Sequence, residues 1–568
     1  MGMALSFLQA NEAGTNVLAF KPLEAAKGMQ RYRMMTTDEA TLNGLKQPLT
    51  FMQLMQSGQR DHGEVYGALK DREDKPLKLP NGAPYICNGT SNPYGSGSGL
   101  DHVTILQKNG KLFMVSQFEC QIGAYYINEL QQDSQGTLSP KSETLRFISQ
   151  KEEFGGYVHC AGMKTPWESH LGSEEYPADA KKLQESGEID LYYNYVKAYW
   201  KEDLSRANPY YYGWIPEIKV DNNGDTSYTK HYSMGRFSHE LAYVMPDRKT
   251  VYMSDDGTNV GLFMYRAKRA EELSEGTLYA AKCRQTSAAK GGSAALEWIR
   301  LGSATDRQIR ALIDPDHNTS TNDGLKFEDI FEVGSISNVC QAGFVSINTE
   351  AGHECLKVKK GMETAAAFLE SRRYAAMLGA TTEFRKEEGI TFDEKNRTLY
   401  VAMSEISRGM EEFSKNGEKD DRYDKGGNND IRLPYNPCGG VYALNVDETY
   451  TATHMRAVLV GKMTEDKGCD LNGIANPDNL SFLQNSHLLA IGEDSSYREN
   501  NMVWTYDVKN NQLTRIISLP KGAEATSPFW YPDINGYGYL LLVTQHPDSD
   551  TEQKGESSVG VLGAIKGL

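Results

Sequence analysis

Acidic residues recur in pairs along this chain, and the chemistry they could carry is cation binding. Several carboxylates gathered at one place repel one another and raise each other's pKa values unless cations neutralise them. Such hard oxygen ligands suit calcium, magnesium or manganese, and ferric iron is also bound well by oxygen. The recurring pairs, with separations of 15, 17, 15 and 18 positions, are Glu240 and Asp255, Glu388 and Glu405, Asp478 and Glu493, and Asp101 and Glu119.

The candidate metal ligands are drawn from these acids and from their acidic or amide neighbours. Glu174 and Glu175 are added from the segment TPWESHLGSEEY. A single acid at a strand end is often only a solvated turn residue, but recurrence in register favours a ligand role. The predicted metal ligands are Glu174, Glu175, Glu240, Asp255, Asp256, Glu388, Asp478, Asn479, Glu493 and Asp494.

Basic residues accompany the acids. Arg236 lies four residues before Glu240, and Arg385 and Lys386 stand just before the next acid pair. A guanidinium group binds phosphate through two parallel hydrogen bonds, and a phosphoryl group held between metals and arginine is a common hydrolytic arrangement. We therefore predict Arg385 and Lys386 as catalytic residues, and Arg385 and Arg236 as substrate-binding residues. The alternative is that each one only pairs with a neighbouring glutamate.

The elements that position these residues are predicted to be β-hairpins. Four stretches share a polar head, an apolar strand, a turn rich in Asp, Asn, Lys or Gly, a second apolar strand and a polar end. A related stretch begins at Gly99. In a hairpin the first strand starts beside the end of the second, so each pair of acids reaches the same sheet edge. The four stretches are HELAYVMPDRKTVYMSDD from His239, EEGITFDEKNRTLYVAMSE from Glu387, PDNLSFLQNSHLLAIGED from Pro477 and SPFWYPDINGYGYLLLVTQH from Ser527.

Equivalent hairpins spread over most of a chain predict an all-β fold, a β-propeller whose strand ends gather around a central funnel. We expect an N-terminal extension with the first strands at residues 1–100 and the propeller at residues 101–568. The hairpins are irregularly spaced, so long insertions must interrupt the ring. One insertion, at about 266–384, contains the helical pattern GMETAAAFLESRRYAAML. Another, at about 411–438, is charged and glycine-rich like a loop.

The composition excludes several classes of protein. The 568 residues carry 60 basic and 76 acidic side chains, and the net charge of −16 disfavours nucleic acid and anionic membranes as partners. No apolar run approaches the roughly 18 residues of a membrane span. The segment MALSFLQA has no basic region and too short an apolar core for a signal peptide. The eight cysteines form no CxxC pair, so neither a disulfide scaffold nor a zinc site is predicted.

Taken together, five segments resemble the PhoX-type alkaline phosphatases, secreted bacterial enzymes built on a β-propeller around iron and calcium. The resemblance implies six blades, a monomer, a periplasmic or secreted location, and hydrolysis of a small phosphate ester, most simply a monoester. It implies calcium as a cofactor, with iron as a possible second metal. The segments are HCAGMKTPWESHLGSEE from His159, GRFSHELAYVMPDRKTVYMSDDG from Gly235, ESRRYAAMLGATTEFRKEEGITFD from Glu370, NPDNLSF from Asn476 and VTQHP from Val543.

The chain departs from the family pattern at two positions that bear on its chemistry. The family's iron-ligating cysteine corresponds to Ser173, and because a hydroxyl binds ferric iron more weakly than a thiolate, this predicts little thiolate-bound iron. The family has an arginine two residues before a metal-binding glutamate. In this chain Lys386 occupies that position, and Arg385 stands three residues before Glu388. Either residue could therefore contact phosphate.

Two other functions are compatible with these patterns. A non-catalytic, calcium-binding propeller that binds a ligand or a protein would tolerate the loss of the cysteine. A lactonase-like propeller with one calcium fits the fold but not the number of acids. Phosphodiesters or triesters are further possible substrates if the altered site changes the preference.

Overall fold

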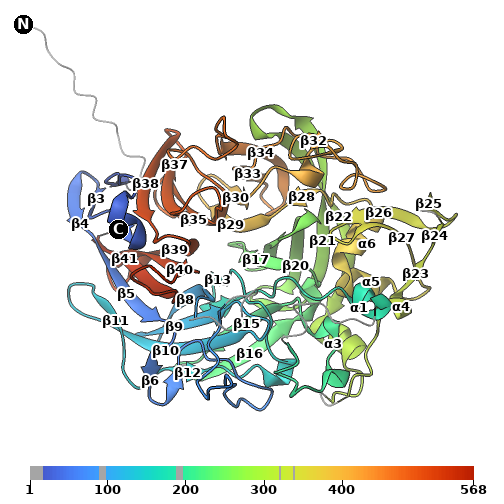
Figure 1. Cartoon of the computed structure of the whole chain (residues 1–568), viewed down its shortest axis with the longest axis horizontal. Helices are drawn as coiled ribbons and strands as arrows, with labels where there is room; N and C mark the ends of the chain where they lie inside the picture. The colour runs from blue at the N-terminus through green and yellow to red at the C-terminus, as the bar shows by residue number, and fades with distance from the viewer. Residues whose placement is uncertain (1–16, 89–96, 187–195, 319–320, 337–338, 568) are drawn as a thin grey trace, which may run out of the picture.

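The computed structural model describes residues 17–88, 97–186, 196–318, 321–336 and 339–567. The segment MALSFLQA, in which no signal peptide was predicted, lies outside these residues. Antiparallel strands radiate around a central axis, and Figure 1 looks along that axis. The predicted all-β propeller is therefore confirmed.

Four-stranded units can be followed around the ring, each beginning with an inner strand. The first contains β8 (Leu100–Lys108), β9 (Lys111–Phe118), β10 (Ala124–Gln132) and β11 (Leu138–Pro140), with β12 (Arg146–Phe147) pairing to β10. The second contains β13 (Met163–Lys164), β14 (Ser169–Leu171), β15 (Ile215–Val220) and β16 (Thr226–His231).

The third and fourth units are joined into one nine-stranded sheet. The third contains β17 (His239–Val244), β18 (Thr250–Asp255), β20 (Phe263–Arg269) and β21 (Glu272–Ser287). The fourth contains β29 (Glu387–Asp393), β30 (Thr398–Met403), β33 (Gly440–Val446) and β34 (Ala452–Val460). The long strand β22 (Ser293–Thr305) pairs with both β21 and β34 and so connects the two units.

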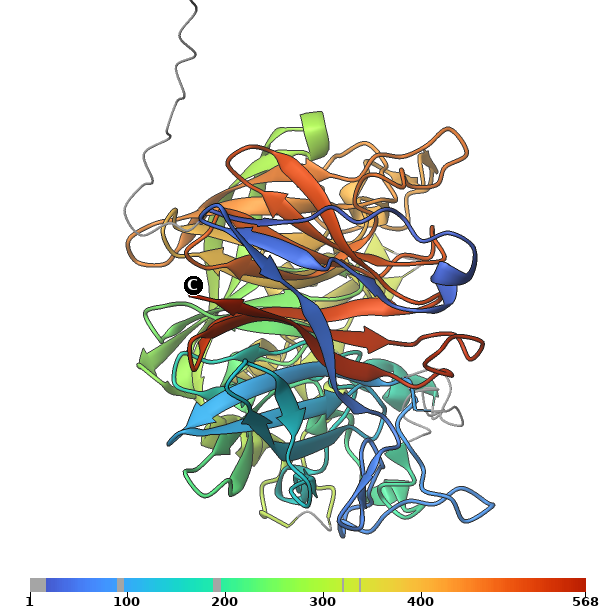
Figure 2. The same cartoon turned by 90° about the vertical axis from the view of Figure 1, so that its left-hand side faces the viewer.

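The last two units include strands from the N-terminal part of the chain. The fifth contains β35 (Pro477–Leu483), β36 (Leu488–Glu493), β37 (Met502–Asp507) and β38 (Gln512–Ser518), with β2 (Met35–Thr36) at its edge. The sixth contains β39 (Glu524–Ile534), β40 (Tyr537–Gln545) and β41 (Ser558–Lys566), and its outer strand is β5 (Thr50–Gln56). Figure 2 shows blue β5 lying beside the red C-terminal strands.

The inner strands form a closed circuit. Strand β8 contacts β13, and contacts continue from β13 to β17, β29, β35 and β39 and back to β8. The number of blades implied by the family resemblance stays a prediction. The five hairpins predicted from the sequence are confirmed as β8–β9, β17–β18, β29–β30, β35–β36 and β39–β40.

The core is divided into clusters that lie between neighbouring sheets. One cluster packs Tyr400 and Ala402 of β30 against Leu489 and Ile491 of β36. Strands such as β40, with the sequence YGYLLLVTQ, are almost continuously apolar because both of their faces are covered. This packing fixes each blade relative to the next and holds the inner strand ends around the axis.

The region at 266–384 holds four of the five α-helices in the described part of the chain. It contains α3 (Asp306–Ile313), α4 (Phe327–Ile330), α5 (Glu363–Leu369) and α6 (Ser371–Met377), whereas α1 (Ala180–Ser186) lies elsewhere. The single helical pattern expected at 361–378 is two short helices, interrupted at Glu370, whose φ of −131° is not helical. Small strands of this region are β23 (Phe331–Val333), β24 (Ser335–Ile336), β25 (Val339–Cys340), β26 (Val345–Thr349), β27 (Gly352–Val358) and β28 (Phe384–Arg385), which pairs with β19 (Thr258–Val260).

The remaining strands are short and peripheral. Residues 411–438 are mostly loop, with only β31 (Ser414–Lys415) and β32 (Glu418–Lys419). The N-terminal part adds β1 (Leu18–Phe20), β3 (Glu39–Leu42), β4 (Leu45–Pro48), β6 (Arg60–Asp61) and β7 (Glu64–Val65). The domain boundaries given above stay a prediction. Among the described residues, none of the helices is both long and apolar enough to cross a bilayer.

The prediction that no disulfide scaffold exists is wrong. Three disulfides join Cys87 to Cys120, Cys340 to Cys355 and Cys438 to Cys469, and only Cys160 and Cys283 are free. Partners separated by 33, 15 and 31 positions give no recognisable spacing, because the fold rather than the local sequence brings them together.

Candidate functional site

Four of the inner strands share a β-bulge at their first residues, and each bulge presents an acid to the central axis. In β17, Glu240 and Leu241 together oppose one residue of β18, because the register passes from His239 opposite Asp255 to Ala242 opposite Met253. The same two-against-one arrangement occurs in β8, β29 and β35. A bulge redirects a side chain and bends its strand. The first bulge residues are Asp101, Glu240, Glu388 and Asp478.

A second set of acids follows the partner strands. Glu119, Asp256 and Asp494 each come directly after the residue that pairs with the head of the hairpin. Both sets open into one cavity of about 270 Å³ on the axis. Its lining residues are Asp101, Glu119, Cys160, Glu175, Tyr176, Glu240, Asp256, Lys386, Glu388, Asp478, Asn479, Asp494, Glu524, Thr526 and His546.

Seven of the ten predicted metal ligands line the cavity. The other three lie outside it and pair with lysine or arginine side chains. Glu174 lies 2.7 Å from the Lys230 ammonium. Asp255 accepts a hydrogen bond of 2.9 Å from Arg372 Nε. Glu493 lies 3.1 Å from an Arg498 nitrogen. Those brought to the cavity are Glu175, Glu240, Asp256, Glu388, Asp478, Asn479 and Asp494.

Burial and mutual repulsion set the protonation of these acids. Burial, together with the charges of Glu388 and Asp101, raises the pKa of Glu240 well above its ordinary value. Burial and Asp256 raise the pKa of Glu388 to about 8. Burial and the charges of Glu388 and Glu240 raise the pKa of Asp478 well above its ordinary value. Buried carboxylates whose pKa values are raised in this way are stable as anions only when cations bind among them.

Two cationic side chains face the acids. The Lys386 Nζ atom lies 3.0 Å from Glu388 and 3.6 Å from Asp256. Burial would lower the pKa of Lys386, but Asp256 and Glu388 raise it well above its ordinary value. Burial likewise opposes protonation of His546, yet its acidic neighbours Glu524 and Glu119 raise its pKa to about 9.

A thiol also lies among the carboxylates. The Cys160 Sγ atom donates to Glu240 Oε2 at 3.0 Å and to Asp101 Oδ2 at 3.5 Å. Ligand atoms of Cys160, Glu175 and Glu240 lie within 4.8 Å of one another, and so do those of Glu240, Glu388 and Asp478. Glu240 belongs to both groups, so its carboxylate would help to hold a metal ion at either of them.

Ser173, which the sequence analysis matched to the family's iron-ligating cysteine, lies outside the carboxylate cavity. Its hydroxyl is fully buried and donates to the backbone carbonyl of Ala161 at 2.7 Å. It does not line the cavity among the described residues. The thiol that reaches the acids comes instead from Cys160, thirteen residues earlier in the chain.

The two predicted arginines do not reach this cavity. Arg385 pairs with Glu405 at 3.1 Å and donates to the carbonyl of Gly257. Arg236 donates to three backbone carbonyls, including that of Tyr212 at 2.7 Å, and lines a second cavity of about 580 Å³. Tyr176 lines both cavities, and its hydroxyl donates to Asp256. The second cavity therefore adjoins the first across one side chain.

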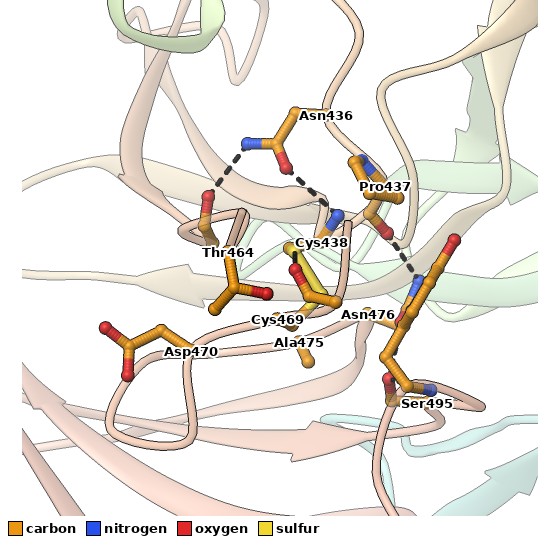
Figure 3. Close-up of a disulfide and its surroundings, with 12 residues drawn as sticks. Asn436, Pro437, Cys438, Thr464, Cys469, Asp470, Ala475, Asn476 and Ser495 are labelled. Atoms are coloured by element: carbon orange, nitrogen blue, oxygen red, sulfur yellow. Dashed lines mark hydrogen bonds between the residues drawn. A yellow bond between two sulfur atoms is a disulfide. The ribbon is translucent and has the colours of Figure 1, made fainter. Parts of the chain in front are cut away.

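The Cys438–Cys469 disulfide supports the head of β35. Figure 3 shows it beside Asn476, two residues before Asp478. The Asn476 amide donates to the carbonyls of Pro437 and Ser404 at 3.0 and 2.9 Å, and its oxygen accepts from Ser495 at 2.6 Å. Asn476 thus anchors the loop that carries Asp478.

Several cavity residues were not among the predicted site residues. Glu524, Thr526 and His546 belong to the sixth unit, whose hairpin lacks the recurring pair of acids found in the other hairpins. His546 lies in the segment VTQHP and Cys160 in HCAGM, both used for the family resemblance, but neither was assigned a role. Asp101 and Glu119 were recognised as a recurring pair and lie together in the cavity.

This fold and this site define a β-propeller with a cavity on its axis that is lined by many carboxylates. The family model of alkaline phosphatase PhoX matches residues 94–548, and the chain belongs to that family. It is accordingly a metal-dependent phosphoester hydrolase of the alkaline phosphatase type.

One solved structure shares the fold at low sequence identity, and two others are less similar. Pseudomonas fluorescens PhoX, in complex with the transition-state analogue vanadate, is 18% identical with a TM-score of 0.61, covering 96% of this chain and 98% of that one. The luciferin-regenerating enzyme (8% identity, TM-score 0.33, 84% and 95% covered) and Kuenenia stuttgartiensis hydrazine synthase (9%, 0.31, 83% and 96%) are more distant. No curated protein sequence matches this chain significantly.

Proposed function

We propose that the chain hydrolyses phosphate monoesters in the carboxylate cavity, with metal ions held by its acids. The observation that carries this proposal is the charge imbalance of the site. Nine acids line about 270 Å³, while Lys386 and His546 are the only lysine, arginine or histidine among the described lining residues. Metal ions would neutralise this excess of negative charge. The Asp101 Oδ1 atom is buried and has no hydrogen-bond partner among the described residues, so it is available as a ligand for a metal ion.

Two metal positions follow from the ligand chemistry. Glu240, Glu388 and Asp478 offer only oxygen, and we assign this group to calcium. Cys160, Glu175 and Glu240 combine sulfur with oxygen, which favours a transition metal such as the iron implied by the family. In this assignment Cys160 supplies the sulfur ligand, so Ser173 in place of a cysteine does not remove thiolate from the site.

The protein's own groups would orient the substrate. When bound, the metal ions would supply Lewis-acid stabilisation of the charge that develops on the phosphoryl oxygens. Lys386, charged and inside the cavity, would donate to those oxygens from the side of Asp256 and Glu388. Arg385 is committed to Glu405, so we assign the phosphate contact to Lys386 rather than to Arg385.

The second cavity would receive the organic part of the ester. It is about twice as large as the metal cavity, and Tyr176 separates the two. Arg236, predicted above to bind substrate, would then contact the leaving group rather than the phosphate. Because Arg236 is 94% buried and held by three carbonyls, it offers a fixed charge at the wall of that cavity.

The test measures metal content and hydrolysis together. Purified protein should contain at least two metal ions per chain and release phosphate from a generic aryl monoester. Glu240→Gln should lose metal and nearly all activity, since Glu240 belongs to both ligand groups. Exhaustive chelation should lower the melting temperature of the wild type, because it leaves unscreened carboxylates. A metal-replete protein that is inactive on monoesters, diesters and triesters would favour the binding-propeller alternative.

The location of the protein is proposed on separate grounds. Three disulfides form and persist in oxidising compartments, which supports a periplasmic or secreted protein. We propose that it acts there as a monomer on small phosphate esters, without a nucleic-acid partner.

A further inference from the structure

A loop after α3 gathers three aspartates away from the carboxylate cavity. Carboxylate oxygens of Asp314, Asp316 and Asp323 lie within 4.8 Å of one another. The loop is closed at its base, where the Leu325 amide donates to the Leu312 carbonyl at 2.8 Å. Asp316 and Asp323 are exposed, whereas Asp314 is 1% exposed and forms the buried floor of the cluster.

The buried member of this cluster lacks hydrogen bonds. Neither carboxylate oxygen of Asp314 has a hydrogen-bond partner among the described residues. Asp314 also caps the C-terminus of α3, where the helix dipole places partial negative charge. A buried carboxylate at that position is doubly unfavourable unless a cation binds it.

The neighbouring arginine does not satisfy this requirement. Arg310 Nε lies 3.7 Å from an Asp314 oxygen, which is too far for a hydrogen bond. Its two terminal nitrogens donate instead to Glu153 at 3.0 Å and to the Glu152 carbonyl at 2.9 Å. One guanidinium is thus shared between two buried acids.

The exposed members of the cluster add charge without compensation. No lysine or arginine in the described part of the chain forms an ion pair with Asp316 or Asp323. Within the described part of the loop, Asp316 accepts from the Asn318 amide at 3.0 Å and the Thr321 hydroxyl at 2.8 Å. Arg310 is therefore the only lysine or arginine in the described part of the chain that forms an ion pair with any of these three aspartates.

We propose that Asp314, Asp316 and Asp323 bind a calcium ion that is separate from the metal centre of the cavity. Calcium accepts six to eight oxygen ligands in flexible geometry, including carboxylates and water, which a surface loop can supply. The proposal does not depend on the phosphatase reaction, since none of these residues lines the catalytic cavity.

The ion would hold the loop against the wall of the second unit. The Tyr211 hydroxyl donates to the Thr321 carbonyl at 3.3 Å, and Asn322 donates to the Ala207 carbonyl at 2.7 Å. The Tyr211 ring stacks on Phe154 with centroids 3.9 Å apart. Calcium at the base of the loop would therefore stabilise contacts that extend into the core.

The experiment compares calcium stoichiometry and stability in full-length protein. The double variant Asp316→Asn/Asp323→Asn should bind one calcium fewer per chain than the wild type, measured by plasma mass spectrometry after dialysis against a fixed free calcium concentration. Its melting temperature should fall less on addition of EGTA, while its hydrolysis rate with saturating calcium stays unchanged. Asp225→Asn, which alters an exposed acid elsewhere, should behave like the wild type.

A second pair of variants separates this ion from those of the cavity. Glu240→Gln should lose cavity metal but keep the loop calcium, so combining it with Asp323→Asn should remove one further calcium. Asp323→Asn alone changes a single exposed residue and serves if the double variant does not fold. Equal calcium content in wild type, Asp323→Asn and the double variant would overturn the proposal.

Discussion

Glu174 and Glu175 are adjacent in the chain, but their carboxylates serve opposite sides of the funnel wall. Glu174 is fully buried against Lys230 and accepts from the amides of Gly213 and Trp214, while Glu175 faces the cavity. Asp255 and Asp256, and likewise Glu493 and Asp494, are divided in the same way. In each pair the first acid pairs with a lysine or arginine side chain and the second lines the carboxylate cavity.

Replacing each member of the first pair should therefore give opposite results. Glu174→Gln leaves Lys230 buried without a counter-charge and should destabilise the fold by about 3–5 kcal/mol, the usual cost of breaking a buried ion pair. Glu175→Gln should instead lower metal content and activity, and the metal-free protein should melt higher because one repelling carboxylate is gone. Denaturant unfolding and metal analysis of both variants test this. Similar losses of stability in the two would contradict the division of roles.

Lys386 and Arg385 offer a comparable contrast for phosphate binding. Lys386→Met should reduce kcat/KM for an aryl phosphate by about 100-fold or more, as expected when a charged donor to the phosphoryl oxygens is removed. Arg385→Met should change kcat/KM only a few-fold, since Arg385 is engaged with Glu405 outside the cavity. Inorganic phosphate should inhibit the Lys386→Met variant more weakly than the wild type. A larger effect from Arg385→Met would reassign the phosphate contact.

Two single variants, Cys160→Ser and Ser173→Cys, would show which position supplies the sulfur ligand. Cys160→Ser should reduce the content of transition metal, and should remove any visible charge-transfer absorption, because thiolate is the stronger donor. Ser173→Cys should leave metal content unchanged, since its side chain points at the Ala161 carbonyl. Absorption spectra and metal analysis decide the matter. Iron uptake that appears only in Ser173→Cys would restore the assignment made from the sequence.

The raised pKa of His231 predicts that the protein loses stability at alkaline pH. Burial opposes its charge, but hydrogen bonds of 3.0 Å to both Asp306 and Glu217 raise its pKa to about 9, above the ordinary 6.5. A group whose pKa is raised by folding stabilises the protein fully below its unfolded pKa, and this contribution is lost as pH rises through the folded pKa. The free energy of unfolding should therefore fall by about 3 kcal/mol between pH 6.5 and above pH 9.

The control for this prediction is another histidine. His231→Gln should flatten the decline in the free energy of unfolding over that pH range, whereas His454→Gln, at an exposed position, should leave it unchanged. Denaturant melts at intervals across the range provide the measurement. An identical decline in wild type and His231→Gln would show that other groups are responsible.

The sequence predicted the hairpins and their acids because strand alternation and turn residues are local signals. It could not choose between Asp255 and Asp256, since both are acids and a shift of one residue reverses the face. The bulges that direct Glu240 and Glu388 inward depend on pairing with a neighbouring strand, which spacing alone does not specify. Cys160 and the disulfides were missed for a related reason, because their partners are distant in sequence.

Closure of the ring by β5 has a consequence for the order of assembly. This strand is made from residues 50–56, but its partner β41 is made from residues 558–566, so the sixth sheet cannot be completed until nearly the whole chain is available. Contacts this distant in sequence form slowly, because the intervening chain must first lose entropy. Until then the walls that carry Glu524 and His546 have no fixed position relative to those that carry Asp101 and Glu119. Metal loading should therefore be a late event in folding, and a chain released before its last strand would bind these ions poorly.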